Sequence, residues 1–206
     1  MEEWLEGEVV KNIKWTKNLA SLKIKAKINN HQAGQFTRIG LKLNDDFITR
    51  SYSYASAPKD ELLEIIYVNI PNGKLSPILH NLKIGDKVSV MQQAIGYFTL
   101  DEIPDGKNLW MLATGTALGV FLAILKTPHP WKRFKKIILI HSVRYSEELI
   151  YQDLIAEIKK LYPDQFIYLN SVTRSKVKGS FNFRIPEGLS SKKFQKSTQI
   201  EINEDS

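Results

Sequence analysis

The pattern of apolar residues changes near residue 105, and this change limits the folds open to the chain. Up to that point, short runs of alternating apolar and polar residues, separated by turn signals, predict strands. These runs lie at residues 19–28, 35–43, 47–56, 62–69 and 87–91. About five or six short strands at this spacing favour a small antiparallel barrel or sandwich.

Beyond residue 105, predicted strands alternate with predicted helices. Apolar strands are predicted at residues 108–113, 137–143 and 166–172. Helices are predicted between them at residues 120–126 and 147–161. This alternation is typical of a parallel sheet joined by right-handed crossovers. The chain is therefore expected to contain an antiparallel β-barrel at residues 1–100, a linker at 101–107, an α/β domain at 108–186 and a polar, disordered tail at 187–206.

Composition excludes several classes of function. The 206 residues contain no cysteine, which removes disulfides, thiolate metal sites and a catalytic thiol. The four histidines share no metal-binding spacing, and His141 lies in a predicted buried strand, where we interpret it as a satisfied core residue. No apolar run reaches the roughly 18 residues that a membrane helix needs, and the acidic start is unlike a signal peptide. We therefore expect a cytoplasmic protein without a membrane anchor.

The charge balance gives a preference among partners. The net charge of +7 favours acidic partners such as nucleic acid, an anionic membrane or an acidic protein. Aromatic residues are scattered through the predicted strands and do not form a stripe with basic residues. A nucleic-acid-binding module is therefore not supported.

Residues 50–56 carry side chains suited to a planar, phosphorylated ligand. In a strand, Arg50, Tyr52 and Tyr54 point to one face, and Ser51 and Ser53 point to the other. A guanidinium can bind phosphate, an aromatic ring can stack on a planar group, and a serine hydroxyl can hydrogen-bond a ring nitrogen. The alternative is an ordinary edge strand with exposed polar residues.

Residues 73–77 place a glycine directly before a predicted helix at residues 74–82. Ser76 is a plausible N-cap, and Pro77 suits the first helical position. Free backbone N–H groups at such a helix start can bind an anion, although a plain capped helix has the same pattern. Together with Arg50, this second phosphate-competent element indicates a diphosphate ligand.

A second group of candidate residues follows the predicted parallel strands. The loop at residues 114–119 contains Gly115 and Gly119, which let a nucleotide approach the backbone, although a tight structural loop would look alike. Arg144 and Arg174 each follow a predicted strand, and Arg184 lies further on. Because ligands bind at the carboxyl ends of such strands, these arginines fit a phosphate monoester such as the 2′-phosphate of NADP. A solvated basic rim is the alternative.

These segments, in this order, resemble the ferredoxin–NADP(+) reductase family, in particular its bacterial flavodoxin/ferredoxin reductases. Residues 50–53 are similar to the family's R-x-Y-S flavin motif, residues 67–69 and 73–77 to its next flavin segments, and residues 113–119 to its nicotinamide-domain loop. The resemblance extends from about residue 3 to Pro186. It implies an FAD-binding barrel followed by an NADP-binding α/β domain.

The resemblance also implies roles for single residues. Arg50 would bind the FAD diphosphate, Tyr52 would stack on the isoalloxazine, and Ser53 would bond its N5 edge. Thr116 would face both flavin and nicotinamide, so the implied catalytic residues are Ser53, Tyr52 and Thr116. The implied FAD-binding residues are Arg50, Ser51, Tyr52, Ser53, Tyr67, Val68, Asn69, Lys74, Leu75, Ser76 and Thr116. The implied NADP-binding residues are Val143, Arg144, Thr173, Arg174 and Arg184.

The implied reaction is hydride transfer between NADP(H) and FAD, followed by single-electron exchange with flavodoxin or ferredoxin. These carriers are typically acidic, which agrees with the net charge of +7. We expect a monomer. The family continues past residues 184–186 to a further strand, a C-G-N-P-type motif and a terminal aromatic residue, so a shortened carboxyl end is expected here. The alternatives are a related NAD(P)H-dependent flavin reductase with another acceptor, and a truncated FAD-binding remnant with little turnover.

Overall fold

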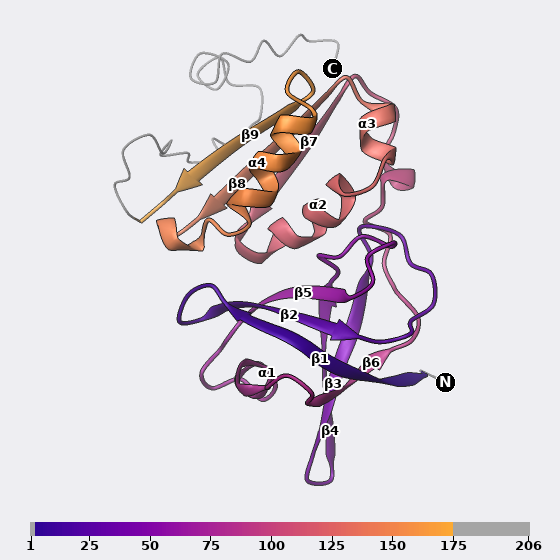
Figure 1. The fold of residues 1–206 in the computed structure, drawn as a ribbon, viewed down its shortest axis with the longest axis vertical. Helices are drawn as coiled ribbons and strands as arrows, with labels where there is room; N and C mark the ends of the chain where they lie inside the picture. The colour runs from indigo at the N-terminus through magenta and orange to yellow at the C-terminus, as the bar shows by residue number, and fades with distance from the viewer. Residues whose placement is uncertain (1–2, 175–206) are drawn as a thin grey trace.

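Six antiparallel strands build the first half of the chain in the computed structural model, which describes residues 3–174 (Figure 1). The strands are β1 (Trp4–Lys14), β2 (Leu19–Lys25), β3 (Phe36–Leu43), β4 (Asp46–Ser53), β5 (Leu63–Val68) and β6 (Lys87–Met91). They pair in the order β4-β3-β6-β1-β2-β5. The sheet curls until its two ends meet at a bridge between Tyr54 and Ile65. The predicted antiparallel barrel is confirmed.

Strand β1 is an element that the sequence pattern did not predict. It pairs with β2 on one side and with β6 on the other, and a bulge separates Val9 from Lys11. Along this strand, Gly7 and Val9 are buried, while Glu6 and Glu8 remain exposed. Two buried positions in eleven residues give too weak an alternation to identify a strand from the local pattern.

The predicted helix at residues 74–82 is shorter than expected. It forms α1 (Ser76–Asn81), and the N-cap position is Leu75 rather than Ser76. The assignment of Ser76 as N-cap was therefore wrong. The Ser76 hydroxyl instead accepts a hydrogen bond of 3.0 Å from the backbone N–H of Ile70, so it ties the preceding turn to the helix start.

Three parallel strands form the sheet of the second half, as predicted. They are β7 (Asn108–Thr114), β8 (Lys136–Val143) and β9 (Phe166–Val172), in the order β7-β8-β9. The crossovers contain the helices α2 (Leu118–Leu125), α3 (His129–Arg133) and α4 (Gln152–Leu161). Short 3-10 turns η1 (Leu100–Glu102), η2 (Gly115–Ala117) and η3 (Ser146–Glu148) complete the described elements.

Two of these helices differ from expectation. Helix α3 was not predicted, because its five residues are fixed by tertiary contacts: the Trp131 ring stacks on Tyr162 with centroids 3.7 Å apart. The helix predicted at residues 147–161 begins only at Gln152. The chain first makes η3, and Tyr151, which has a left-handed conformation with φ of 57°, is then the N-cap of α4.

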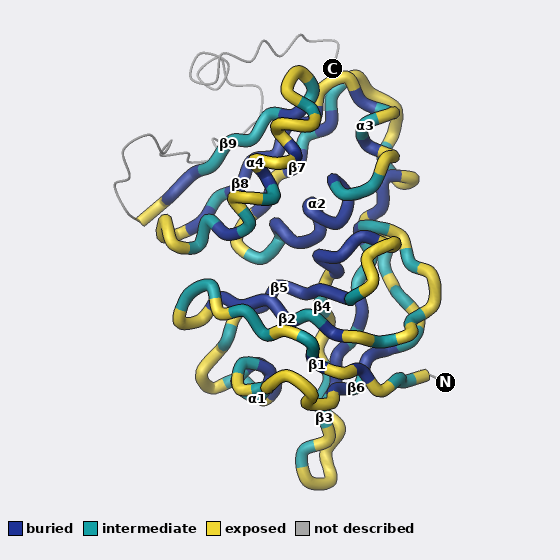
Figure 2. Tube along the Cα trace, in the orientation of Figure 1, coloured by how far each residue is buried: buried dark blue, intermediate teal, exposed yellow. Residues whose placement is uncertain are grey.

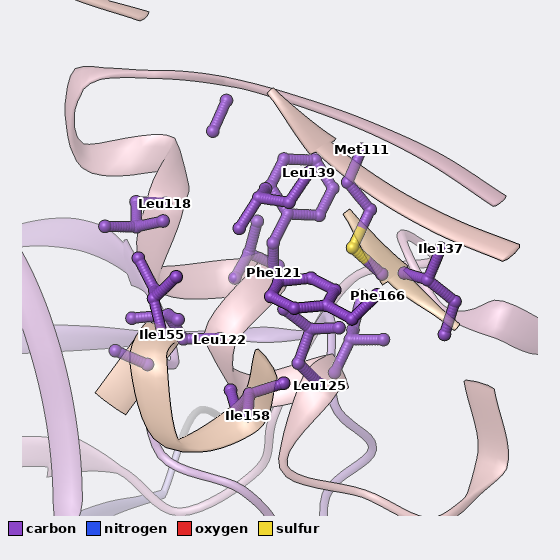
Figure 3. Packing of buried hydrophobic residues seen from close by; sticks show 14 of the residues in the cluster. Met111, Leu118, Phe121, Leu122, Leu125, Ile137, Leu139, Ile155, Ile158 and Phe166 are labelled. Atoms are coloured by element: carbon purple, nitrogen blue, oxygen red, sulfur yellow. The ribbon is translucent and has the colours of Figure 1, made fainter. Parts of the chain in front are cut away.

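Helix α2 lies between the parallel sheet and the barrel and is buried on every side (Figures 1 and 2). Its side chains pack with those of β7, β8, β9 and α4 in one apolar cluster (Figure 3). Gly119 faces the barrel, where an added Cβ would come within 3.1 Å of Ile66 and 3.2 Å of Ala55. A larger residue there would push the helix away from the barrel, so Gly119 allows the two halves to share one core.

Polar contacts also join the two halves. The Tyr151 hydroxyl, next to α4, donates to the buried Glu64 carboxylate on β5. Lys126, directly after α2, donates to the Ala55 carbonyl at 3.0 Å and to Asp60 at 3.1 Å. Within residues 3–174, no helix is long and apolar enough to cross a membrane. Arg184 and the predicted tail at residues 187–206 lie outside the described residues.

Candidate cofactor site at the junction of the two halves

A hollow of about 490 Å³, called the junction hollow below, opens where the parallel sheet meets the barrel. It brings together predicted site residues from both halves that are far apart in the sequence. The predicted residues that line it are Val68, Thr116, Val143, Arg144 and Thr173. The remaining lining residues are Asn18, Leu19, Thr114, Gly115, Ser142 and Glu148.

The parallel topology explains this gathering. The carboxyl ends of β7, β8 and β9 lie at the same edge of the sheet, so Thr114, Val143 and Thr173 become neighbours. The turn after β8 and the turn after β9 are also joined, because the Arg174 N–H donates to the Arg144 carbonyl at 2.8 Å. Both arginines are exposed at this edge, as the sequence predicted for residues following parallel strands.

Glu148 is a residue of the junction hollow that the sequence analysis missed. Its carboxylate accepts hydrogen bonds from the backbone N–H groups of Arg144 and Tyr145, at 2.9 and 3.1 Å. It therefore fixes the backbone that carries Arg144. The glutamate has the spacing of a capping box, but the N-cap residue is Tyr145 instead of the usual serine or threonine, so the local pattern contains no clear signal.

The loop after β7 contains the predicted residue Thr116. Gly115 has a φ of +52°, a left-handed conformation that residues with a Cβ rarely adopt. An added Cβ would meet no atom within 4 Å, so the backbone conformation, rather than lack of space, favours glycine here. The loop lies between the end of β7 and α2, and Thr116 is half-buried in the wall of the hollow.

A second, shallower hollow of about 430 Å³ lies on the barrel, and we call it the barrel hollow. Its lining residues are Arg38, Asp46, Phe47, Ile48, Thr49, Arg50 and Lys74. Arg50 and Lys74 therefore share one surface, as expected from the link between Arg50 and the helix start at residues 73–77. Arg38 was missed, because a single arginine on a neighbouring strand gives no local signal; it donates to the Thr49 hydroxyl at 2.7 Å. Three cationic side chains against one carboxylate make this hollow suited to an anion.

Tyr52 and Ser53 continue the same strand but line neither of the two hollows. Tyr52 is half-buried against the barrel core, whereas Ser51 and Ser53 are exposed. Burial raises the pKa of Tyr52 to about 12, with the Arg50 charge acting in the opposite direction. Tyr52 therefore remains a neutral phenol at neutral pH.

The other predicted residues of the barrel are more buried than their predicted roles suggest. The Tyr67 hydroxyl donates to the Asn12 side chain at 3.0 Å, and burial raises the pKa of this tyrosine. Leu75 and Ser76 are also buried. These three residues can contact a ligand through the backbone only. The Asn69 side-chain oxygen is buried and, within residues 3–174, has no hydrogen-bond partner, so it is an acceptor available to a bound molecule.

Comparisons with known proteins agree with this geometry. The family model described as an oxidoreductase FAD-binding domain matches residues 6–98, and the oxidoreductase NAD-binding domain matches residues 111–198. The chain is 40% identical to the flavodoxin/ferredoxin–NADP reductase of Escherichia coli (strain K12) over 205 residues, which cover 100% of this chain and 83% of the relative. The chain belongs to the flavodoxin/ferredoxin–NADP reductase family.

Two further similarities support the family assignment. The flavodoxin/ferredoxin–NADP reductase of Buchnera aphidicola subsp. Schizaphis graminum (strain Sg) is 43% identical, over 98% of this chain and 82% of that relative. The ferredoxin NADP+ reductase of Neisseria gonorrhoeae, solved with bound FAD and NADP, superposes with a TM-score of 0.87 at 30% identity. That match covers 98% of this chain and 82% of the solved chain.

The residues present fit the two cofactors of the family. Arg38, Arg50 and Lys74 form a cationic surface of the kind that binds a diphosphate. The unpartnered Asn69 oxygen lies next to Val68, which is 47% exposed and lines the junction hollow. A cofactor that extends from the barrel hollow along β4 and β5 would therefore meet both polar and apolar partners.

Proposed function

We propose that this chain exchanges electrons between NADP(H) and bound FAD at the junction hollow. The single observation that carries the proposal is the composition of that hollow. Val68 from the barrel faces Thr116, Val143 and Thr173 from three parallel strands or the loops that follow them. Such a hollow lets a ligand on the barrel contact a ligand on the parallel sheet, which is what transfer between two cofactors requires.

FAD would be bound by the barrel. Arg50 and Lys74 would bind the diphosphate, and Arg38 joins them because it lines the same hollow. Tyr52 would stack on the isoalloxazine, with Ser51 and Ser53 supplying hydroxyl groups from the other face of β4. Tyr67, Val68, Asn69, Leu75 and Ser76 would contribute backbone groups. Asn69 would also contribute its side-chain oxygen, which has no hydrogen-bond partner among residues 3–174.

NADP(H) would be bound at the carboxyl edge of the parallel sheet. Val143 and Thr173 would contact the nucleotide, and Arg144 and Arg174 would bind its 2′-phosphate. The backbone bond between Arg174 and Arg144 keeps the two arginine-bearing turns adjacent. Arg184 retains its predicted role as a third phosphate ligand, and it lies outside the described residues.

FAD, when bound, accepts two electrons together from NADPH and releases them one at a time to a one-electron carrier. The chain's own residues position and desolvate the reacting groups. Thr116 lies in the wall of the junction hollow, and it would contact both cofactors there. Ser53 and Tyr52 would orient the flavin ring from the barrel side, and Tyr52 does so as a neutral phenol.

The physiological partner would be a flavodoxin or a ferredoxin. The names of the relatives and the net charge of +7 support an acidic electron-transfer partner. We further propose that the protein is a monomer. We also propose that it works in the cytoplasm, a reducing compartment that fits the lack of cysteine. The division into residues 1–100, 101–107 and 108–186 stays a prediction.

An anaerobic titration tests the proposal. Purified protein is reconstituted with FAD and titrated with NADPH or NADH, while the flavin absorbance is recorded. We expect NADPH to bleach the flavin, and added flavodoxin or ferredoxin to restore the absorbance. A protein that does not bind FAD would refute the proposal, and a yellow protein that NADPH does not bleach would support the alternative of a remnant with little turnover.

A further inference from the structure

His141 is a titratable residue that the proposed function leaves without a role. It lies near the carboxyl end of β8, between Ala113 on β7 and Asn170 on β9. Its side chain is wholly buried. The Nε2 atom lies 3.2 Å from the Gly115 carbonyl oxygen, and the Nδ1 atom lies 3.5 Å from the Tyr168 hydroxyl.

These contacts determine which ring nitrogen of His141 carries the proton. A carbonyl oxygen can only accept, so Nε2 must donate to Gly115. In the neutral ring, Nδ1 is then the acceptor, and the Tyr168 hydroxyl can donate to it across the longer distance. The Tyr168 oxygen in turn accepts from the Gln152 amide at 3.0 Å. One directed chain of hydrogen bonds therefore runs from α4 through β9 and β8 to the loop after β7.

The last link of this chain helps to hold the orientation of one peptide group. Because the peptide is trans, the Gly115 carbonyl and the Thr116 N–H point in opposite directions. The bond to the buried His141, together with a backbone hydrogen bond from the Leu118 N–H, holds this carbonyl, so the Thr116 N–H points away from His141. Gly115 and Thr116 both line the junction hollow. The orientation of this peptide therefore decides what the wall of the hollow offers to a ligand.

We propose that His141 is a positioning residue that, together with the Leu118 N–H, fixes the Gly115–Thr116 peptide for binding of the nicotinamide cofactor. This role rests on the proposed function of the junction hollow. His141 does not touch the hollow itself and acts through the loop. Tyr168 and Gln152 support it by keeping the donor of the imidazole directed at Gly115.

The electrostatic surroundings agree with a neutral imidazole. The groups that face the ring are the Gly115 carbonyl from η2, the Tyr168 hydroxyl from β9 and the nearby Glu148 carboxylate from η3. Burial lowers the pKa of His141 to about 4, although the Gly115 carbonyl and Glu148 act in the opposite direction. Around neutral pH, the Nε2 atom of His141 therefore stays the hydrogen-bond donor and the Nδ1 atom stays the acceptor.

A matched pair of substitutions separates positioning from simple filling of space. His141→Gln keeps an amide N–H in the place of Nε2, whereas His141→Met has a similar size but no donor. We expect His141→Met to raise the dissociation constant for NADP+ about tenfold, the effect of one buried hydrogen bond, with the FAD affinity unchanged. His141→Gln should restore most of the NADP+ affinity. Calorimetric titration of each purified variant with NADP+ measures this.

Tyr168→Phe gives an independent test if the His141 variants do not fold. We expect this substitution to raise the dissociation constant for NADP+ about threefold. His129→Phe, at an exposed position on α3, is the matched control and should leave the dissociation constant for NADP+ unchanged. A second readout needs no cofactor: the ¹⁵N chemical shifts of the His141 ring in the wild-type protein should show Nε2 protonated at neutral pH.

Several outcomes would overturn the proposal. A His141→Met variant that binds NADP+ at least as well as His141→Gln would show that the ring only fills space. Equal losses of FAD and NADP+ affinity would indicate general destabilisation, and a ring protonated at Nδ1 would contradict the hydrogen-bond chain. Wild-type protein that binds no NADP+ would instead refute the proposed function, and the role of His141 with it.

Discussion

The Tyr151 hydroxyl donates a hydrogen bond of 2.6 Å to the Glu64 carboxylate and so connects the α/β half to the barrel. Glu64 is 4% exposed, and its other oxygen lies 3.7 Å from the Lys23 ammonium group. Tyr151 supplies the donor from a left-handed backbone conformation. The bond therefore both satisfies a buried carboxylate and fixes the barrel against the start of α4.

Tyr151→Phe should lower the free energy of unfolding by about 1–3 kcal/mol, because it leaves a buried carboxylate oxygen without its donor. Urea denaturation measures the loss. Tyr97→Phe is the control, since that ring is 83% exposed and its hydroxyl reaches solvent. Equal stabilities of Tyr151→Phe and the wild type would show that water replaces the lost hydroxyl.

Arg50→Ala and Lys74→Ala should each weaken FAD binding by about 10- to 100-fold, because each removes a charged donor from the barrel hollow. Fluorescence titration of FAD into flavin-free protein measures the dissociation constant. Lys42→Ala removes an exposed charge on the adjacent strand β3 and should leave FAD affinity nearly unchanged. A similar loss of FAD affinity in all three variants would indicate that the overall positive charge attracts FAD, without a specific diphosphate site.

Arg144→Ala or Arg174→Ala should raise the KM for NADPH by about tenfold while changing the KM for NADH little, because only NADPH carries the 2′-phosphate. Steady-state reduction of an artificial acceptor measures both constants. Lys159→Ala, in the exposed last turn of α4, controls for loss of charge. If both KM values rise equally, the assignment of the 2′-phosphate to these arginines is wrong.

Stability should fall as the pH is lowered from about 6.5 toward 4. The unfolded chain protonates His141 near its ordinary pKa of 6.5, whereas burial lowers the pKa of this residue to about 4 in the folded protein. As the pH falls, the unfolded state therefore binds a proton at a higher pH than the folded state. The free energy of unfolding falls by about 3 kcal/mol over this range. At pH values above 6.5 both states are neutral, and this effect disappears.

Urea denaturation at a series of pH values compares the wild type with His141→Gln. Burial also lowers the pKa values of His31 and His80, so the variant should keep part of the pH dependence and lose the part due to His141. Identical pH dependence in the two proteins would show that His141 does not titrate as described.

The local sequence determined most of the secondary structure of the parallel sheet. Residues 137–140 are apolar without interruption, because a central parallel strand is buried on both faces, and β8 was predicted for that reason. The segment at residues 50–53 likewise suggested a ligand-binding strand, and the resemblance of the other segments favoured this interpretation over an ordinary edge strand. In both cases the initial indication lies within a few consecutive residues.

Only the tertiary structure decided the features that depend on distant residues. Tyr151 and Glu64 are 87 positions apart, and no local pattern indicates that the tyrosine takes a left-handed conformation to reach the carboxylate. The same holds for Arg38, which joins Arg50 and Lys74 through strand pairing.

Periodicity along the chain reports which face of an element is buried, so the sequence by itself determined the two fold types. Most of the candidate residues came from the resemblance of short segments to a known family. Periodicity does not show which helices and strands pack against each other. The junction hollow, the hydrogen-bond chain through His141 and the contact between Tyr151 and Glu64 all arise from chain segments that only packing brings together. Their geometry was therefore decided by the shared core around α2.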